Sequence, residues 1–251
     1  MTGELCVARL VLMNHFTFFL AYAVAGLGAQ LHVAAAERGF VTIFNAKDFT
    51  GWSQKGGKAK YAVVNGEIVG TAVSGTPNSF MCTKKLFGDF ILEYEYKCDN
   101  RLNSGVQIRS NAYDKEVTKT LENGKTRKFP AGRVHGYQVE IDPNKPERMW
   151  SAGIYDEGRR GWLFPGLRGG DGSTFTKVGK KTYKPNEWNK VRVECRGNSI
   201  KTWLNGVARA DFKDELTAKG FIGLQVHGIG KKKELAGAQV RWRNLRIKEL
   251  R

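Results

Sequence analysis

The chain has 251 residues, a formal net charge of +17 and a hydrophobic fraction of 41%. Beyond residue 36 there are three cysteines (Cys82, Cys98 and Cys195), which excludes a small fold held together by a disulfide framework. No stretch after Gly39 is long and apolar enough to span a membrane. Residues 37–251 are enough to bury a sizeable core and suit a single β domain.

The N-terminus carries the pattern of a secretory signal peptide. Residues 10–28 are largely apolar, Arg9 precedes them, and three alanines end at Ala36. We therefore expect residues 1–36 to be removed, leaving residues 37–251 in a secreted or periplasmic protein with no membrane span. The alternative is a membrane anchor, because the apolar run is close to the minimum spanning length.

The remaining chain reads as short strands separated by turns. Two hairpins turn at Asn-Gly pairs, at Asn65 and Asn205. The only helical turn that we expect is Glu215 to Lys219. This pattern predicts an all-β sandwich of two antiparallel sheets. In chain order, the expected strands are Val41–Phe44, Tyr61–Val64, Glu67–Val69, Phe90–Cys98, Gly105–Ser110, Tyr137–Ile141, Lys190–Cys195, Ser199–Leu204, Val207–Asp211, Phe221–His227 and Val240–Lys248.

Two long stretches, Asn111 to Val134 and Asp156 to Asn186, appear irregular in the sequence. Loops of this length in a compact domain are usually functional or disordered. The second is rich in glycine and contains Trp162, which could either stack on a sugar ring or pin the loop to the sheet.

Polar side chains alternate with apolar ones along four of the expected strands. Since alternate residues of a strand share a face, polar faces can form on adjoining strands, and such faces suit a sugar. The residues that share faces are Glu93 and Glu95; Gln107 and Arg109; Gln138, Glu140 and Asp142; and Gln225 and His227.

The excess of positive charge has two interpretations. It could attract an acidic polysaccharide, or it could lie on solvated loops, because the lysines cluster in the expected turns. The lysines neither form a helical stripe nor interleave with stacking aromatics, so nucleic acid is not the expected partner. Cys195 is expected to be a buried thiol, and a bond between Cys82 and Cys98 is left open.

Eight motifs resemble the 3-keto-disaccharide hydrolase domain family. They occur in the family's order and are spread over Val41 to Leu250, nearly the whole chain beyond residue 36. In one departure, Ala46 stands where the opening motif usually has glycine. The matching segments are Ile43–Trp52, Ser104–Arg109, Gly136–Asp142, Gly153–Asp156, Asn186–Asn189, Trp203–Gly206, Gly223–Gly228 and Arg243–Ile247.

The resemblance implies a concanavalin-A-like jelly roll whose concave sheet binds the ligand. It also implies an exported protein that acts on glycosides. No phosphate-cradling loop and no His-Glu-x-x-His spacing occurs, so the sequence predicts neither a cofactor nor a metal, although Glu140, Asp142, His135 and His227 are competent metal ligands.

A 3-keto sugar has an acidic proton on C2, and its removal lets the group on C1 leave before water adds. This chemistry needs a base, an acid and donors for the enolate oxygen. We expect Glu140, Asp142 and His227 to transfer protons. The expected substrate-binding residues are Gln107, Arg109, Gln138, Gln225, Glu95, His135 and Trp162.

Three alternatives stay open at this point. Glu140 and Asp142 could act as the two carboxylates of an ordinary glycosidase. The same fold could also serve as a carbohydrate-binding module without catalysis. A third possibility is a structural or adhesive protein of the cell surface, held by its basic charge.

Overall fold

The computed structural model describes residues 38–122 and 124–251. The expected signal peptide at residues 1–36 lies outside the described residues and stays a prediction. No helix among the described residues has the length and apolar character needed to cross a membrane.

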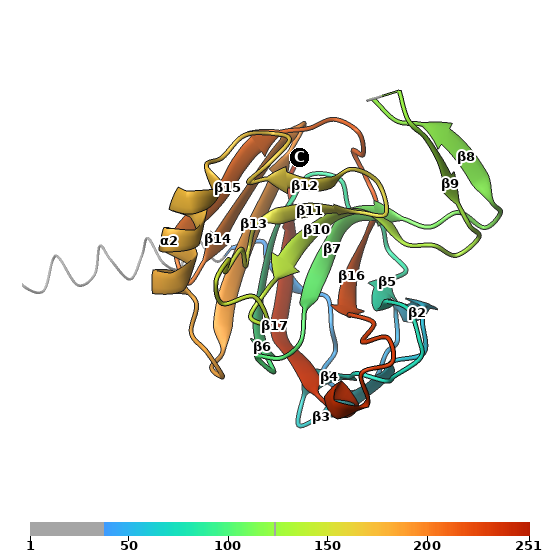
Figure 1. The fold of residues 1–251 in the computed structure, drawn as a ribbon, viewed down its shortest axis with the longest axis vertical. Helices are drawn as coiled ribbons and strands as arrows, with labels where there is room; N and C mark the ends of the chain where they lie inside the picture. Colours follow the sequence, from blue (N-terminus) through green and yellow to red (C-terminus); the bar gives the residue numbers. More distant parts are fainter. Residues whose placement is uncertain (1–37, 123) are drawn as a thin grey trace, which may run out of the picture. The chain divides into compact units, whose positions relative to one another are not determined.

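Two large antiparallel sheets make up the domain (Figure 1), and they confirm the prediction of an all-β sandwich. The first has eight strands, seven of them in one path, with β1 paired to β17 beside that path. In spatial order the path is β15 (Val207–Lys213), β14 (Ser199–Leu204), β13 (Asn189–Arg196), β6 (Phe90–Cys98), β17 (Gln239–Glu249), β4 (Glu67–Thr71) and β3 (Lys60–Val64), and β1 is Val41–Thr42.

The second sheet has seven strands and carries most of the polar motifs. In spatial order they are β12 (Gly161–Phe164), β11 (Ile154–Glu157), β10 (His135–Ile141), β7 (Ser104–Asn111), β16 (Phe221–Val226), β5 (Ser79–Thr83) and β2 (Trp52–Gly56).

The core lies between the facing sides of the two sheets. Leu92 and Tyr94 of β6 belong to the same buried cluster as Val106 of β7 and Val139 of β10. These apolar residues alternate with polar ones, so the opposite face of the second sheet is left for Gln107, Gln138 and similar side chains. Burial of the apolar face therefore determines which side of the sheet carries the chemistry.

The two stretches that looked irregular contain regular structure. The first forms the hairpin of β8 (Val117–Thr120) and β9 (Thr126–Phe129), which projects beyond the sheets in Figure 1. The second contains β12 and the helix α2 (Gly172–Thr182).

Helix α2 was not expected, whereas the expected helical turn at Glu215 to Lys219 is absent. The side chain of Asp171 caps α2 by accepting a hydrogen bond from the Thr174 amide at 2.7 Å, and Lys180 and Lys181 occupy its last turn. Glycine and threonine are poor helix formers, so these end signals were the main trace of the helix in the sequence.

The 3-10 helix η1 (Lys233–Leu235) lies in the connection between β16 and β17.

The three cysteines beyond residue 36 are all buried and free. Cys82 lies on β5 and Cys98 on β6, in different sheets.

Candidate functional site

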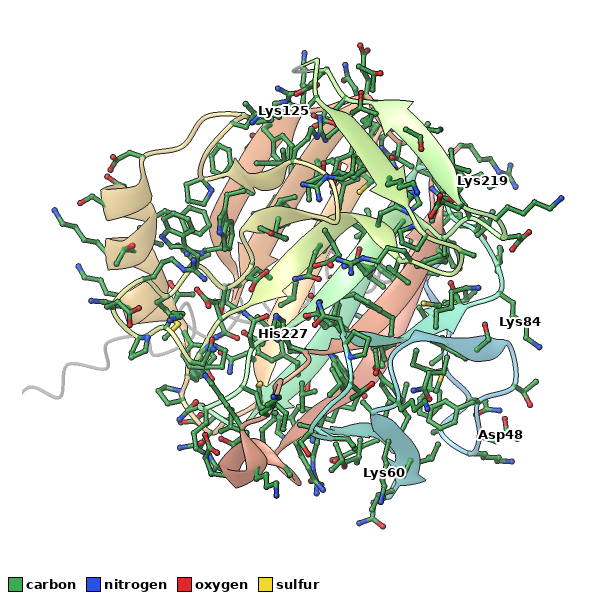
Figure 2. All side chains as sticks on the ribbon, turned by 45° about the vertical axis from the view of Figure 1, so that its right-hand side comes forward. Asp48, Lys60, Lys84, Lys125, Lys219 and His227 are labelled. Atoms are coloured by element: carbon green, nitrogen blue, oxygen red, sulfur yellow. The ribbon has the colours of Figure 1, made fainter. Side chains whose placement is uncertain are left out.

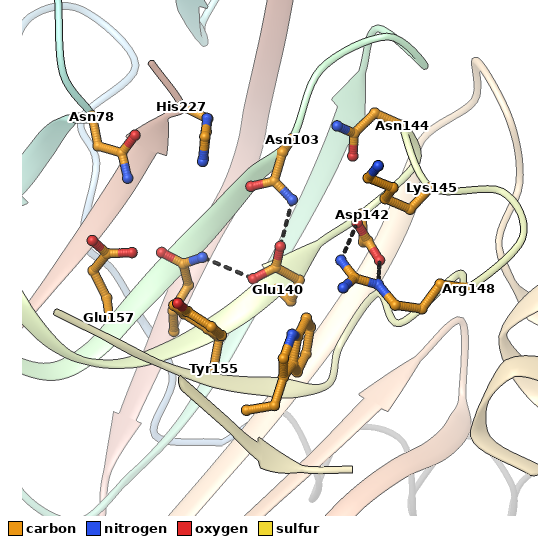
Figure 3. Close-up of a pocket in the computed structure, with 12 residues that line it drawn as sticks. Asn78, Asn103, Glu140, Asp142, Asn144, Lys145, Arg148, Tyr155, Glu157 and His227 are labelled. Atoms are coloured by element: carbon orange, nitrogen blue, oxygen red, sulfur yellow. Dashed lines mark hydrogen bonds and ion pairs between the residues drawn. The ribbon is translucent and has the colours of Figure 1, made fainter. Parts of the chain in front are cut away.

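A cavity of about 400 Å³ opens on the polar face of the second sheet (Figure 3). Strand β10 supplies Gln138 and Glu140, and Asp142 follows directly after it. The other walls come from β11, β12, the loop after β10 and the segment after β16. Among their residues are Tyr155, Glu157, Trp162, Arg148 and His227.

Strand register places the polar side chains in rows across the sheet. Gln138 lies opposite Gln107 on one side and Tyr155 on the other, and Trp162 follows Tyr155. In the neighbouring row, Gly105 lies between Glu140 and Gln225. Because Gly105 has no side chain, the amide of Gln138 can lie over it: a Cβ there would be 2.5 Å from Gln138 Cγ.

A chain of amides orients Glu140. Gln107 and Gln225 each donate from Nε2 to Gln138 Oε1, at 2.6 and 2.8 Å. Two donors on this oxygen leave the amide nitrogen of Gln138 facing Glu140, where it donates to Oε2 at 2.8 Å. Ser110 extends the chain by donating to Gln107 Oε1 at 2.7 Å. Gln107 and Gln225 thus act behind the cavity wall and do not line it.

Glu140 is 4% exposed, and Asn103 donates to its Oε1 at 2.5 Å. Burial raises the pKa of Glu140 to about 8. The charge of Asp142 acts in the same direction, although the hydrogen bonds from Asn103 and Gln138 oppose it. At neutral pH this carboxyl therefore holds a proton that it can donate.

Asp142 has a different environment although it lies on the same strand face. It is fully buried, and Arg148 donates to its two oxygens at 2.8 and 2.9 Å. Two parallel hydrogen bonds of this kind fix the carboxylate and the guanidinium relative to each other. The expectation that Asp142 transfers protons is not supported by this geometry, which gives it a role in holding Arg148 at the cavity wall.

His227 projects into the cavity near Asn78 (Figure 3), and it lies near the middle of the face seen in Figure 2. Its Nδ1 is 2.8 Å from the carbonyl oxygen of Gly228. Since a carbonyl only accepts, Nδ1 carries the hydrogen and Nε2 keeps a free lone pair. Burial lowers the pKa of His227, against the opposing effect of that hydrogen bond, so the imidazole is neutral at pH 7.

Trp162 lines the cavity, as expected. It packs edge-on against Trp150 and Tyr155, with ring centroids 4.7 and 5.5 Å apart. The guanidinium of Arg148 lies 4.8 Å from the Trp162 ring centroid. The indole is thus held in place and also contributes an aromatic surface to the cavity.

Besides Gln107 and Gln225, three further expected site residues do not line the cavity. Glu95 belongs to β6 in the other sheet, where Arg243 donates to it at 2.7 Å. His135 is buried between Tyr113 and Phe129, with ring centroids 4.6 and 4.7 Å away, beside the β8–β9 hairpin. The structure therefore does not bring these two residues to the cavity.

Arg109 is the third expected site residue that lies away from the cavity, and a β-bulge in β7 is the cause. Its φ of 45° interrupts the alternation, and the registers of β7 with β10 and β16 shift there. Its buried side chain donates to Asp89 and to the carbonyl oxygens of Gly88 and Gly197. Strict alternation had placed it beside Gln107, whereas Ser110 takes that position.

Comparison with known proteins agrees with this architecture. The sequence model of the 3-keto-alpha-glucoside-1,2-lyase-like domain matches residues 39–248. The chain belongs to this family. Its membership confirms the resemblance seen in the sequence and links the domain to carbohydrate chemistry. None of the curated proteins compared with the chain matches it.

Two solved structures show the same fold as this 3-keto-alpha-glucoside-1,2-lyase-like domain. A "putative glycosyl hydrolase" from Parabacteroides distasonis is 20% identical, with a TM-score of 0.51 over 87% of this chain and 97% of that one. A Bacillus subtilis protein of unknown function with a galectin-like fold is 10% identical, with a TM-score of 0.54 over 84% and 94% of the two chains. These likenesses confirm the lectin-type jelly roll.

Several cavity residues of the lyase-like domain were missed in the sequence. Tyr155 and Glu157 alternate on β11, so their shared face was readable there. The others lie in turns and loops, where no periodicity reports direction: Asn78, Asn103, Asn144, Lys145 and Arg148. The described residues contain no group of three or more His, Cys, Asp or Glu side chains arranged to hold a metal ion.

We expect Gly105→Ala to disturb the lyase-like site specifically. The added Cβ would overlap the Gln138 side chain, so Gln138 must move away from Glu140. The overpacking should cost about 1–3 kcal/mol of unfolding free energy, measured by urea denaturation. Gly88→Ala is the control, since its Cβ would meet only Ala218 O at 3.7 Å. Equal stability of the two variants would contradict the packing argument.

Proposed function

We propose that this protein cleaves 3-keto-glycosides by eliminating the group at C1 and then adding water. The observation that carries the proposal is a pair of uncharged proton-transfer groups on one cavity. Glu140 is protonated at neutral pH because its pKa is about 8, and His227 is neutral with Nε2 unprotonated. An acid and a base of this kind are what the elimination needs.

In this mechanism His227 Nε2 takes the proton from C2 of the sugar. The electron pair left on C2 is delocalised onto the C3 oxygen as an enolate. When the enolate collapses, the C1–oxygen bond breaks and a C1–C2 double bond forms. Glu140 donates its proton to the departing oxygen. Water then adds across the double bond: ionised Glu140 takes a proton from the water whose oxygen bonds to C1, and His227 returns its proton to C2. This gives the free 3-keto sugar and restores both residues to their starting protonation states.

Polar groups around the cavity suit the developing charge. Asn78 and Lys145 line it and can donate to the enolate oxygen. Tyr155 and Trp162 offer aromatic surface to the apolar face of a sugar ring. Gln138 contributes to substrate binding by keeping Glu140 in position.

The ordinary two-carboxylate glycosidase is less well supported. It needs a second carboxylate that can act as nucleophile or base. Of the other two carboxylates that line the cavity, Asp142 is fully buried with both oxygens bound by Arg148, and Glu157 accepts a hydrogen bond from Arg133 at 3.0 Å. The elimination mechanism does not depend on either of them.

The test is turnover of 3-keto-glucosides, and of the corresponding unoxidised glucosides, by the wild type and by Glu140→Gln and His227→Ala. We expect cleavage of the oxidised compounds alone and loss of most activity in both variants. Full activity in both variants would refute the assignment of the site. If the wild type binds glycosides without cleaving any of them, the protein is a carbohydrate-binding module instead. The aromatic surface of Trp162 in the cavity is the observation that favours this second function.

A further inference from the structure

A second cavity, of about 680 Å³, adjoins the site. It lies between strand β9 of the projecting hairpin and the turn that joins β11 to β12. Tyr155 and Glu157 line both cavities. A ligand longer than one sugar unit can therefore extend from the site into this neighbouring cleft.

Basic side chains outnumber acidic ones among the residues that line the cleft. Two lining residues are acidic, Asp156 and Glu157, and six are basic, so the lining residues alone carry a formal excess of four positive charges. The six basic residues are Lys125, Arg127, Lys128, Arg133, Arg159 and Arg160.

The acidic groups of the cleft are already bound by some of these cations. Arg159 and Arg160 donate to Asp156 at 2.7 and 2.5 Å, and Arg133 donates to Glu157 at 3.0 Å. Neither carboxylate is free to offset another positive charge. Lys128 is paired with Glu116 at 2.8 Å, and Arg160 is also paired with Glu122 and Asp214. The positive charge that an entering ligand can meet without displacing one of these ion pairs therefore includes that of Arg127.

Arg127 is the cation best placed to bind a ligand. It is exposed on β9, and no described residue forms a hydrogen bond or ion pair with its guanidinium. It also lies close enough to Tyr155 to act on it: burial raises the pKa of Tyr155, and the charge of Arg127 works against that rise. Arg127 thus lines the cleft together with Tyr155, one of the two residues that the cavities share.

The hairpin that carries Arg127 is tied to the body of the domain. Glu122, in the hairpin turn, accepts hydrogen bonds from Arg160 at 3.2 Å and from Arg168 at 2.6 and 2.8 Å. Arg160 is itself held by Asp156 and Asp214. These ion pairs hold the two walls of the cleft together, so Arg127 is positioned over the cleft.

We propose that the cleft is a subsite for an anionic group, a carboxylate or sulfate, on the leaving portion of the substrate, and that Arg127 binds this group. The planar guanidinium can contact two oxygens of such a group at once. The inference rests on the proposed function, because it names the class of glycoside that the site takes.

The experiment compares three 3-keto-glucosides that differ only in the leaving sugar: glucose, glucuronate and glucose 6-sulfate. At low ionic strength the wild type should have a kcat/KM about tenfold higher for at least one anionic compound than for the neutral one. Arg127→Gln should remove that preference and leave kcat/KM for the neutral compound unchanged. Added salt should shrink the preference in the wild type.

Lys84→Gln is the matched control, with the same change of charge at an exposed lysine away from the cleft, as Figure 2 shows for Lys84 and Lys125. It should keep the full preference. Equal kcat/KM for all three compounds in the wild type, or a preference that survives Arg127→Gln, would overturn the subsite while leaving the proposed function intact.

If no 3-keto-glucoside is cleaved, the proposed function fails, and calorimetric titration with the same three compounds decides the subsite separately. Tighter binding of an anionic compound that is lost in Arg127→Gln would uphold the subsite. Equal binding of all three compounds would overturn it.

Discussion

The kcat/KM of this protein for a 3-keto-glucoside is expected to fall as the pH rises through about 8, the pKa of the buried Glu140. The acid form of Glu140 predominates below that pH and is lost above it, so a general acid stops working on the alkaline side. On the acidic side, kcat/KM should fall where His227 gains a proton, at a pH below the ordinary pKa of histidine because burial lowers the pKa of His227. A pH profile of kcat/KM measures both limbs.

Glu140→Gln should lower kcat/KM by about 10²- to 10⁴-fold, the usual contribution of general acid–base catalysis. It should also abolish the alkaline limb, because the glutamine has no proton to lose. Glu157→Gln is the control: Glu157 lines the same cavity and burial also raises its pKa, yet it is not assigned to proton transfer. A profile that rises through pH 8 would show instead that ionised Glu140 is the base.

Arg148→Met is expected to give a large loss of stability, about 3–5 kcal/mol of unfolding free energy. It leaves Asp142 fully buried without the guanidinium that binds both of its oxygens. The same substitution removes the cation from beside Trp150 and Trp162. Urea denaturation monitored by tryptophan fluorescence measures the change.

The double variant Asp142→Asn, Arg148→Met should recover much of that loss, because it removes the charge that the single variant leaves unpaired. Lys145→Met is the control from the same loop, and as an exposed site it should change stability by no more than about 0.5 kcal/mol. If the double variant is as unstable as Arg148→Met alone, the loss comes from packing against the tryptophans and not from the buried carboxylate.

The alternation of polar and apolar residues predicted the second sheet well. On β10 it placed Gln138, Glu140 and Asp142 together correctly, since each apolar neighbour is drawn into the core. It failed at Arg109, where one bulged residue reverses the alternation beyond it. The sequence carried no comparable signal for the bulge, because arginine is not a residue that usually marks a positive φ.

Alternation also cannot tell which sheet a strand joins. Glu95 has the same local pattern as Gln138, yet β6 pairs with β13 and β17 and so belongs to the opposite sheet. Strand pairing depends on contacts between distant parts of the chain. For the same reason, loop residues such as Asn103 and Arg148 entered the site only once the loops were positioned.

The bulge at Arg109 has a consequence for how the protein can adapt to different glycosides. Strand β7 carries Gln107 beneath the site, and a short distance along it Arg109 reaches Asp89, beside the start of β6, and the carbonyl of Gly197 between β13 and β14. These hydrogen bonds connect the strand beneath the site to the opposite sheet. Selection for new substrates is therefore expected to alter the surrounding loops and the β8–β9 hairpin, while the strand beneath the site retains its geometry.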